Sequence, residues 1–184
     1  MLNEINLENI YCGFINSYNQ FLFPAGDDDN YAQETHALIE YFRRLGLNNG
    51  YYPYCELMRR DLEWYSEKDN DKSILHLEAE NVYSRFDYTL EKIIDSGSPY
   101  AVAILWTNSI ENKVENNLRM FCKRIKTNKS ILVIVRFSGR IRIRKGVLGY
   151  RFCGYELSKD KFRKLDAARI LWPDEGFQTI EWEK

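Results

Sequence analysis

Two strongly apolar segments, separated by a polar helical segment, constrain the fold of this chain more than any other feature. Residues 100–106 and 130–137 are almost continuously apolar, and residues 110–126 between them have the length and polarity of a surface helix. Such apolar runs are typical of strands buried on both faces, and a helix between two of them favours parallel pairing. The sequence therefore predicts an α/β fold with a mixed central sheet flanked by helices.

The residues before this unit alternate between helix and strand signals. Apolar spacing and turn residues predict, in order, a helix at 31–45 ended by Gly46, extended segments within 50–65, a hairpin-type turn at 67–72, a short strand at 73–77, and a helix at 81–96 that Gly97 and Pro99 stop. The two strands that flank the turn are expected to pair antiparallel. The helix at 81–96 is then a crossover to the first buried strand.

The residues after the second buried strand are strongly basic. Residues 136–157 are interpreted as a basic hairpin, residues 158–169 as a short basic helix and residues 169–182 as a final extended segment. Within the hairpin, three arginines alternate with isoleucines and so share one face of a strand: Arg140, Arg142 and Arg144. A face with three guanidinium groups needs water or an anionic partner.

The length of 184 residues favours one domain, which we divide into three parts. Residues 1–30 are expected to be an N-terminal helical and loop extension, 31–137 the core, and 138–184 the basic hairpin and C-terminal segment. The longest apolar run, 131–135, is far shorter than a membrane helix, and the acidic start lacks the basic region of a signal peptide. We therefore expect a cytoplasmic protein with no membrane partner.

Charge is strongly segregated along the sequence, although the net charge is only -1. Residues 119–164 contain 15 Lys or Arg and two acidic residues, whereas residues 1–118 contain nine basic and 20 acidic residues. An acidic half beside a basic half is typical of a metal site next to a phosphate-binding surface. Two alternatives remain open, namely accidental surface patterning and a fold that mixes the two halves in space.

Three carboxylates carry the chemistry that the sequence suggests: Asp61, Glu78 and Glu80. Glu78 and Glu80 are two residues apart, so on a strand they project to one face, and Asp61 on the paired strand can join them. Carboxylates that converge on an apolar sheet repel unless a cation neutralises them or one binds a proton. The alternative is a purely structural role, in which both glutamates lie on the solvent face of an edge strand and Asp61 pairs with a neighbouring arginine.

These residues resemble the PD-(D/E)xK, or restriction-endonuclease-like, nuclease superfamily. The resemblance lies in the order of a helix with acidic residues, a strand with Asp, a hairpin, a strand with acid-x-acid or acid-x-Lys, a helix and a further strand, and covers roughly residues 34–106. It implies that Asp61 and Glu78 bind Mg²⁺, with Mn²⁺ as a substitute. The position that usually holds the water-orienting lysine is Glu80 here, and Glu40 resembles the upstream acid of the metal site, with Glu34 as a weaker candidate.

Two further side chains near this constellation each allow two interpretations, and they are Lys92 and His76. Lys92 lies on the helix after Glu80, where its amino group could reach back and replace the motif lysine, or simply lie on the exposed helix surface. His76 has the same strand parity as Glu78, so it either borders the site or is a hydrogen-bonded structural residue.

The resemblance implies Mg²⁺-dependent hydrolysis of nucleic acid, with a DNA endonuclease as the expected activity. The residues expected to contact the nucleic acid are Arg140, Arg142, Arg144, Lys145, Lys123 and Arg124. A homodimer is expected if the protein cuts both strands of a duplex, whereas a monomer fits a repair or mobile-element nuclease. The alternatives are a non-catalytic domain that keeps the nuclease fold to bind nucleic acid or a protein, and an interaction protein whose acidic half mimics nucleic acid.

Overall fold

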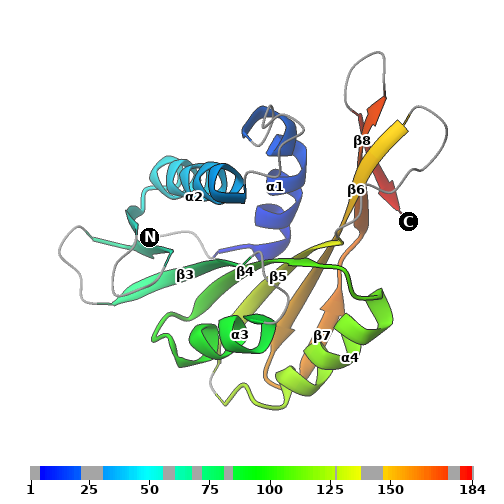
Figure 1. Cartoon of the computed structure of the whole chain (residues 1–184). Helices are drawn as coiled ribbons and strands as arrows, with labels where there is room; N and C mark the ends of the chain where they lie inside the picture. The colour runs from blue at the N-terminus through cyan, green and yellow to red at the C-terminus, as the bar shows by residue number, and fades with distance from the viewer. Residues whose placement is uncertain are drawn as a thin grey trace.

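A single mixed sheet organises the computed structural model, which describes residues 5–21, 31–55, 61–67, 72–80, 85–126, 128–137, 147–173 and 179–183 (Figure 1). The described helices are α1 (Leu7–Phe21), α2 (Tyr31–Asn48), α3 (Phe86–Asp95) and α4 (Glu111–Cys122). The strands are β1 (Tyr52–Cys55), β2 (Leu62–Tyr65), β3 (Ser73–Glu80), β4 (Tyr100–Thr107), β5 (Ser130–Phe137), β6 (Val147–Ser158), β7 (Lys161–Lys164), β8 (Ala167–Pro173) and β9 (Thr179–Glu183).

The strands lie in the order β1-β2-β3-β4-β5-β6-β8-β9, and β7 pairs with β6. The neighbours β3, β4 and β5 are parallel, and every other pair is antiparallel. β4 and β5 are strongly apolar and almost entirely buried, and α3 and α4 are the crossovers between the parallel strands, as parallel pairing requires. The expected α/β architecture with a mixed central sheet is confirmed.

Helices cover both faces of the sheet (Figure 1). α1 and α2 pack on the face that carries Leu75 and Leu77, and α3 and α4 pack on the face that carries Ala101 and Ala103. α1 is part of this core, because Ile15 is fully buried. None of the helices in the described ranges combines the length and the hydropathy needed to span a bilayer.

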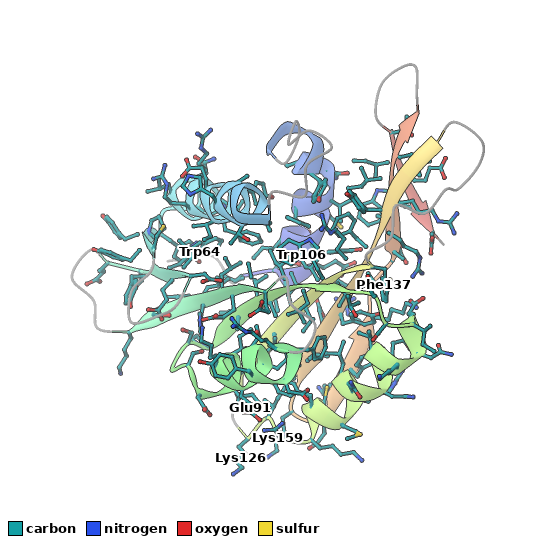
Figure 2. All side chains as sticks on the ribbon, in the orientation of Figure 1. Trp64, Glu91, Trp106, Lys126, Phe137 and Lys159 are labelled. Atoms are coloured by element: carbon teal, nitrogen blue, oxygen red, sulfur yellow. The ribbon has the colours of Figure 1, made fainter. Side chains whose placement is uncertain are left out.

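Helix α2 does not end at Gly46, as the sequence predicted, but continues to Asn48. Gly46 instead allows a close approach between helix and sheet, since a Cβ atom there would lie 2.7 Å from Nε1 of Trp64. That indole N–H donates a hydrogen bond to the carbonyl oxygen of Phe42 over 3.1 Å. Figure 2 shows Trp64 on the α2 side of the sheet. The backbone turns at Gly50, where φ is +80°.

The short basic helix predicted at 158–169 is wrong, because this region contains the end of β6, then β7 and the start of β8. Ser158 pairs with Lys161 across a two-residue turn, and Asp160 in that turn has a positive φ of 59°. Asp is among the few residue types that tolerate this conformation. Antiparallel pairing of β5 with β6 fits the predicted hairpin, although residues 138–146 lie outside the described residues.

Candidate functional site

The register of the β2–β3 ladder places Asp61 beside Glu78. Leu62 pairs with Leu77 and Glu63 with His76, so the residue before Leu62 continues the ladder opposite Glu78. Directly paired residues of an antiparallel ladder point to the same face of the sheet. Oδ2 of Asp61 accepts a hydrogen bond of 2.7 Å from the backbone N–H of Ala79. This bond fixes the carboxylate next to the first residue of β2.

Glu78 is the centre of a buried polar cluster. Its Oε1 lies 2.7 Å from Nε2 of His76, and its Oε2 accepts a hydrogen bond of 2.6 Å from Nζ of Lys92. Leu75 and Leu77 point to the opposite face, so the alternation of β3 separates the core from this cluster. The predicted solvent-exposed alternative therefore does not describe Glu78, which is buried together with His76.

Lys92 enters the cluster from α3, the helix that covers this face of the sheet. The side chain of Lys92 is 28% exposed, so its amino group bridges the buried glutamate and the solvent. The tip of Lys92 also lies 5.7 Å from the ring centre of Tyr88, one helical turn earlier. The structure thus brings an ammonium group from the covering helix to the first acid of the acid-x-acid pair.

Negative charge is in excess in this cluster. Burial raises the pKa of Asp61, and the nearby Glu78 carboxylate raises it further, while the hydrogen bond from Ala79 and the charge of Lys92 act in the opposite direction. An environment that disfavours the charged form of one carboxylate favours the uptake of a proton or a cation. This electrostatic feature is typical of functional sites, although structural ion pairs also produce it.

Glu63 is a member of the cluster that the sequence analysis missed. Its side chain is 0% exposed, it pairs directly with His76, and it accepts a hydrogen bond of 3.0 Å from the hydroxyl of Tyr65. A buried carboxylate is rare unless it has partners, so this residue adds to the acidic character of the face. The signal was available in the sequence, because Glu63 is two residues after Asp61 and so shares its strand parity.

Glu80 lies on the same face as Glu78, at the last position of β3. It is partly exposed, and one carboxylate oxygen is 3.9 Å from a guanidinium nitrogen of Arg85, which begins the turn into α3. A separation of 3.9 Å in a partly exposed setting makes a weak ion pair. Glu80 is therefore the more accessible acid of the pair, and Glu78 the buried one.

The structure does not bring Glu40 to this cluster, which departs from the expected upstream metal ligand. Helix α2 covers the opposite face of the sheet, and Glu40 accepts hydrogen bonds from Arg43 and Arg44 on its own helix. These contacts lower the pKa of Glu40 to about 2. The side chain of Glu34 lies outside the described residues.

Two carboxylates of the cluster, those of Asp61 and Glu78, could supply oxygen ligands to a divalent cation. In the part of the chain that the structure describes, no group of three or more His, Cys, Asp or Glu side chains has the arrangement of a metal site. Mg²⁺ is commonly held by one or two carboxylates and completed by waters and substrate phosphate, so a complete cage of protein ligands is not required. Asp61 and Glu78, on neighbouring strands, are the residues that would supply those oxygens.

Two of the six basic residues expected to bind nucleic acid belong to the described part of the chain. Arg140, Arg142, Arg144 and Lys145 lie outside the described residues. Lys123 and Arg124 are exposed just after α4, and Arg124 forms an ion pair of 2.8 Å with Glu91 of α3. Figure 2 places Glu91 on the α3 side of the sheet, where the carboxylate cluster also lies.

The charge segregation of the sequence is partly cancelled in space. Arg151 of the basic half binds Glu111 of the acidic half, at 2.8 Å. Arg163 binds Glu8 at 2.9 Å. Lys129 and Arg136 are buried. The fold thus mixes the two halves, which was one of the alternatives left open by the sequence.

One large hollow in the described part of the chain lies away from the carboxylates. A hollow of 970 Å³ lies at the amino ends of β4 and β5, lined by residues that include Asn6, Tyr100 and Ser130.

Neither the family models nor the curated proteins give a match to this chain. The geometry around Asp61, Glu78 and Lys92 is therefore the feature that bears on function.

Proposed function

We propose that this protein is a Mg²⁺-dependent nuclease that hydrolyses phosphodiester bonds, with a DNA endonuclease as the favoured activity. The observation that carries the proposal is the hydrogen bond from Lys92 to Glu78, at a site where the register sets Asp61 beside Glu78. Two acids and an ammonium group on one face are the groups that the PD-(D/E)xK resemblance requires. The lysine is supplied by α3 and not by β3.

The order of the elements supports this reading. Helix α2 is followed by the antiparallel strands β1, β2 and β3, by the crossover helix α3 and by the parallel strand β4. This order agrees with the helix, strands, hairpin, helix and strand on which the resemblance is based. Asp61 immediately precedes β2, and the acid-x-acid pair lies at the end of β3.

In this mechanism Asp61 and Glu78 would hold Mg²⁺, and the ion would supply positive charge at the scissile phosphate. His76 is a positioning residue, because its Nε2 holds Oε1 of Glu78. Lys92 donates hydrogen bonds from a partly solvent-accessible amino group and so orients the attacking water. Glu80, the more accessible acid, accepts a proton from that water as the water oxygen bonds to phosphorus. The P–O bond to the leaving oxygen breaks in the same displacement, and that oxygen takes a proton from solvent.

DNA is the proposed substrate on the strength of the resemblance. A homodimer would serve to cut both strands of a duplex, whereas a monomer suffices to cut one strand. Arg140, Arg142, Arg144 and Lys145 would bind the phosphate backbone, with Lys123 and Arg124 as further contacts. Backbone contacts of this kind are sequence-independent and weaken as salt concentration rises.

A non-catalytic binding domain is the second candidate, and one observation favours it. Both carboxylate oxygens of Glu78 are already bonded, to His76 and Lys92, as in a structural ion-pair network. A domain that kept the fold without the chemistry would retain these contacts for stability. Metal binding and cleavage separate the two candidates.

The test is cleavage of supercoiled plasmid and of circular single-stranded DNA by the purified protein, in Mg²⁺, Mn²⁺ or EDTA. We expect metal-dependent cleavage that Asp61→Asn abolishes and that Lys92→Met lowers by about 10²- to 10⁴-fold, the usual contribution of a positioned acid–base group. Lys126→Met, which removes an exposed lysine remote from Glu78, is the matched control and should cleave like the wild type.

Mg²⁺ binding by isothermal titration calorimetry provides a readout that does not depend on substrate. The proposal requires heat of binding in the wild type that Asp61→Asn weakens. Absence of both cleavage and Mg²⁺ binding would contradict the nuclease and leave the binding domain. Cleavage that survives in Asp61→Asn would mean that a contaminating nuclease or a different site is responsible.

A further inference from the structure

Exposed tyrosine rings gather on the face of the sheet that carries the carboxylates. Tyr52 and Tyr54 of the edge strand β1 are 43% and 36% exposed, and Tyr88 of α3 is 58% exposed. Tyr54 pairs with Glu63 and Tyr52 with Tyr65 in the β1–β2 ladder, so both point to the face of Glu63. These three rings are called the tyrosine platform below: Tyr52, Tyr54 and Tyr88.

The platform borders the carboxylate cluster on two sides. On the β1 side, the ring of Tyr54 packs edge-on against Tyr65 with 5.3 Å between ring centres, and the hydroxyl of Tyr65 donates to Glu63. β1 is separated from β3 by one strand, which corresponds to about 10 Å at the usual strand spacing. On the α3 side, Tyr88 lies next to the amino group of Lys92.

The exposed tyrosines of β1 do not indicate a site where another β-strand pairs with this edge of the sheet. β1 is the outermost strand of the sheet, and Pro53 in its middle has no N–H to donate. Proline on an edge strand disfavours pairing with a further chain. Pro53 also points to the opposite face from the two tyrosines, since it pairs with Trp64. A ligand for this face must therefore be recognised through the ring surfaces and not through the strand edge.

We propose that the tyrosine platform stacks against unpaired bases, so that the protein acts on single-stranded or locally unpaired nucleic acid. The inference rests on the proposed function, which puts the phosphate of the bound strand at Asp61 and Glu78. Base faces are covered by neighbouring pairs in a duplex and are available only when a base is unpaired. Lys92 and the exposed Arg85 supply positive charge for the backbone between the rings.

Stacking on tyrosine is tolerant of sequence, because every base has a flat face. Each ring that carries a base is expected to contribute about 5- to 150-fold to the dissociation constant. The contribution belongs to the ring and not to the hydroxyl. Phenylalanine should therefore replace tyrosine on the platform, and alanine should not.

The experiment measures binding without cleavage, by fluorescence anisotropy of labelled oligonucleotides in EDTA. The probes are a single-stranded DNA, a single-stranded RNA of the same sequence and the corresponding DNA duplex. The variants are Tyr52→Ala with Tyr54→Ala, the same pair changed to Phe, and Tyr88→Ala. Met120→Ala, which removes an exposed apolar side chain from α4, is the control, and thermal melts of each variant verify folding.

We expect the alanine variants to lose at least about 5-fold in affinity for single strands, with the Phe pair and Met120→Ala unchanged and duplex binding little affected. Loss on both DNA and RNA supports stacking, and loss on one alone supports it and identifies the sugar. Equal affinity of the wild type for duplex and single strand, or equal losses in the Phe and Ala pairs, would overturn the inference.

The outcome can be separated from that of the nuclease proposal. Tyrosine-dependent binding of single strands without metal-dependent cleavage would refute the hydrolase and retain the platform. Cleavage that depends on Asp61 but not on the three tyrosines would refute the platform and retain the hydrolase.

Discussion

Lys129 binds the C-terminus of α3, the helix that carries Lys92, and a substitution there tests how much these contacts stabilise the fold. Its side chain is 3% exposed, and its Nζ donates to the carbonyl oxygens of Ile93, Ile94 and Ser96, over 2.5, 3.2 and 2.5 Å. The hydroxyl of Ser96 also lies 2.8 Å from Nζ, so one of the three N–H groups of Lys129 is shared between two acceptors. The carbonyls at the end of a helix have no N–H of the next turn to bind, so one buried ammonium group serves the C-terminus of α3.

Replacing Lys129 with methionine keeps an unbranched side chain and removes the ammonium group. A hydrogen bond to a charged group contributes about 1.5–3 kcal/mol, and a buried carbonyl left without a donor costs about 1–3 kcal/mol. The variant also avoids the desolvation cost of a buried charge, which is several kcal/mol, so the separate contributions do not simply add. We expect a net loss of about 3 kcal/mol, which for a chain of this size lowers Tm by about 6–12 °C.

Urea unfolding followed by circular dichroism measures this loss for Lys129→Met. The matched control is Lys126→Met, which removes an exposed lysine and should change the free energy of unfolding by less than about 0.5 kcal/mol. A loss below about 1 kcal/mol for Lys129→Met would refute the reasoning, because the contacts to the end of α3 would then contribute little to stability.

Two further predictions concern packing and ionisation. Gly46→Ala should destabilise the protein by about 1–3 kcal/mol in the same unfolding assay, although alanine favours helix, because the new methyl group overlaps Trp64; a gain in stability would show that the indole moves aside. Burial alone would raise the pKa of Glu111, but hydrogen bonds from Lys164 and Arg151 outweigh it and lower the pKa to about 2. Its contribution to stability is therefore complete above the ordinary value of 4.5 and is lost as pH falls towards 2. The difference in unfolding free energy between the wild type and Glu111→Gln should shrink over that range, and a constant difference would contradict the assignment.

Much of the fold follows from local patterns in the sequence. The strand expected at 130–137 has those bounds as β5, and the strand expected at 100–106 is one residue longer as β4. Both are long apolar runs, for which burial on two faces leaves few alternatives. Helices α3 and α4 lie within the ranges expected from helical spacing, with shorter ends.

The incorrect predictions arose where distant contacts decide the structure. Gly46 looks like a helix end, but the requirement for it is Trp64, which lies 18 residues later in the chain. The basic stretch after Ser158 has apolar residues that fit either a helix or a strand. Pairing with the long strand β6 decides in favour of β7, and local spacing does not contain that information.

In the candidate site, too, local spacing predicts some positions and distant contacts decide others. Side chains alternate between the two faces along β3, and β2 pairs antiparallel with β3, so Asp61 and Glu78 lie on one face. The spacing of the residues in the sequence was enough to predict this shared face. The position of Glu40 could not, since it depends on which face of the sheet α2 covers. Glu63 was overlooked because the motif draws attention to the acid at the strand start and not to the next residue of equal parity.

The source of the ammonium group leads to a final prediction about Glu80 and Lys92. A lysine at position 80 would start about 6.6 Å along the strand from Glu78, on the same face, and could direct its amino group towards the site that Lys92 reaches from α3. If Lys92 replaces the lysine of the acid-x-Lys pattern, Lys92→Met should lose cleavage, and Glu80→Lys with Lys92→Met should cleave more than Glu80→Gln with Lys92→Met, which lacks the same proton-accepting carboxylate. Higher cleavage by the lysine variant would assign one role to two positions in the chain. A Glu80→Lys double variant no more active than the Glu80→Gln one, while folded and able to bind Mg²⁺, would mean that Lys92 stabilises Glu78 and takes no part in orienting water.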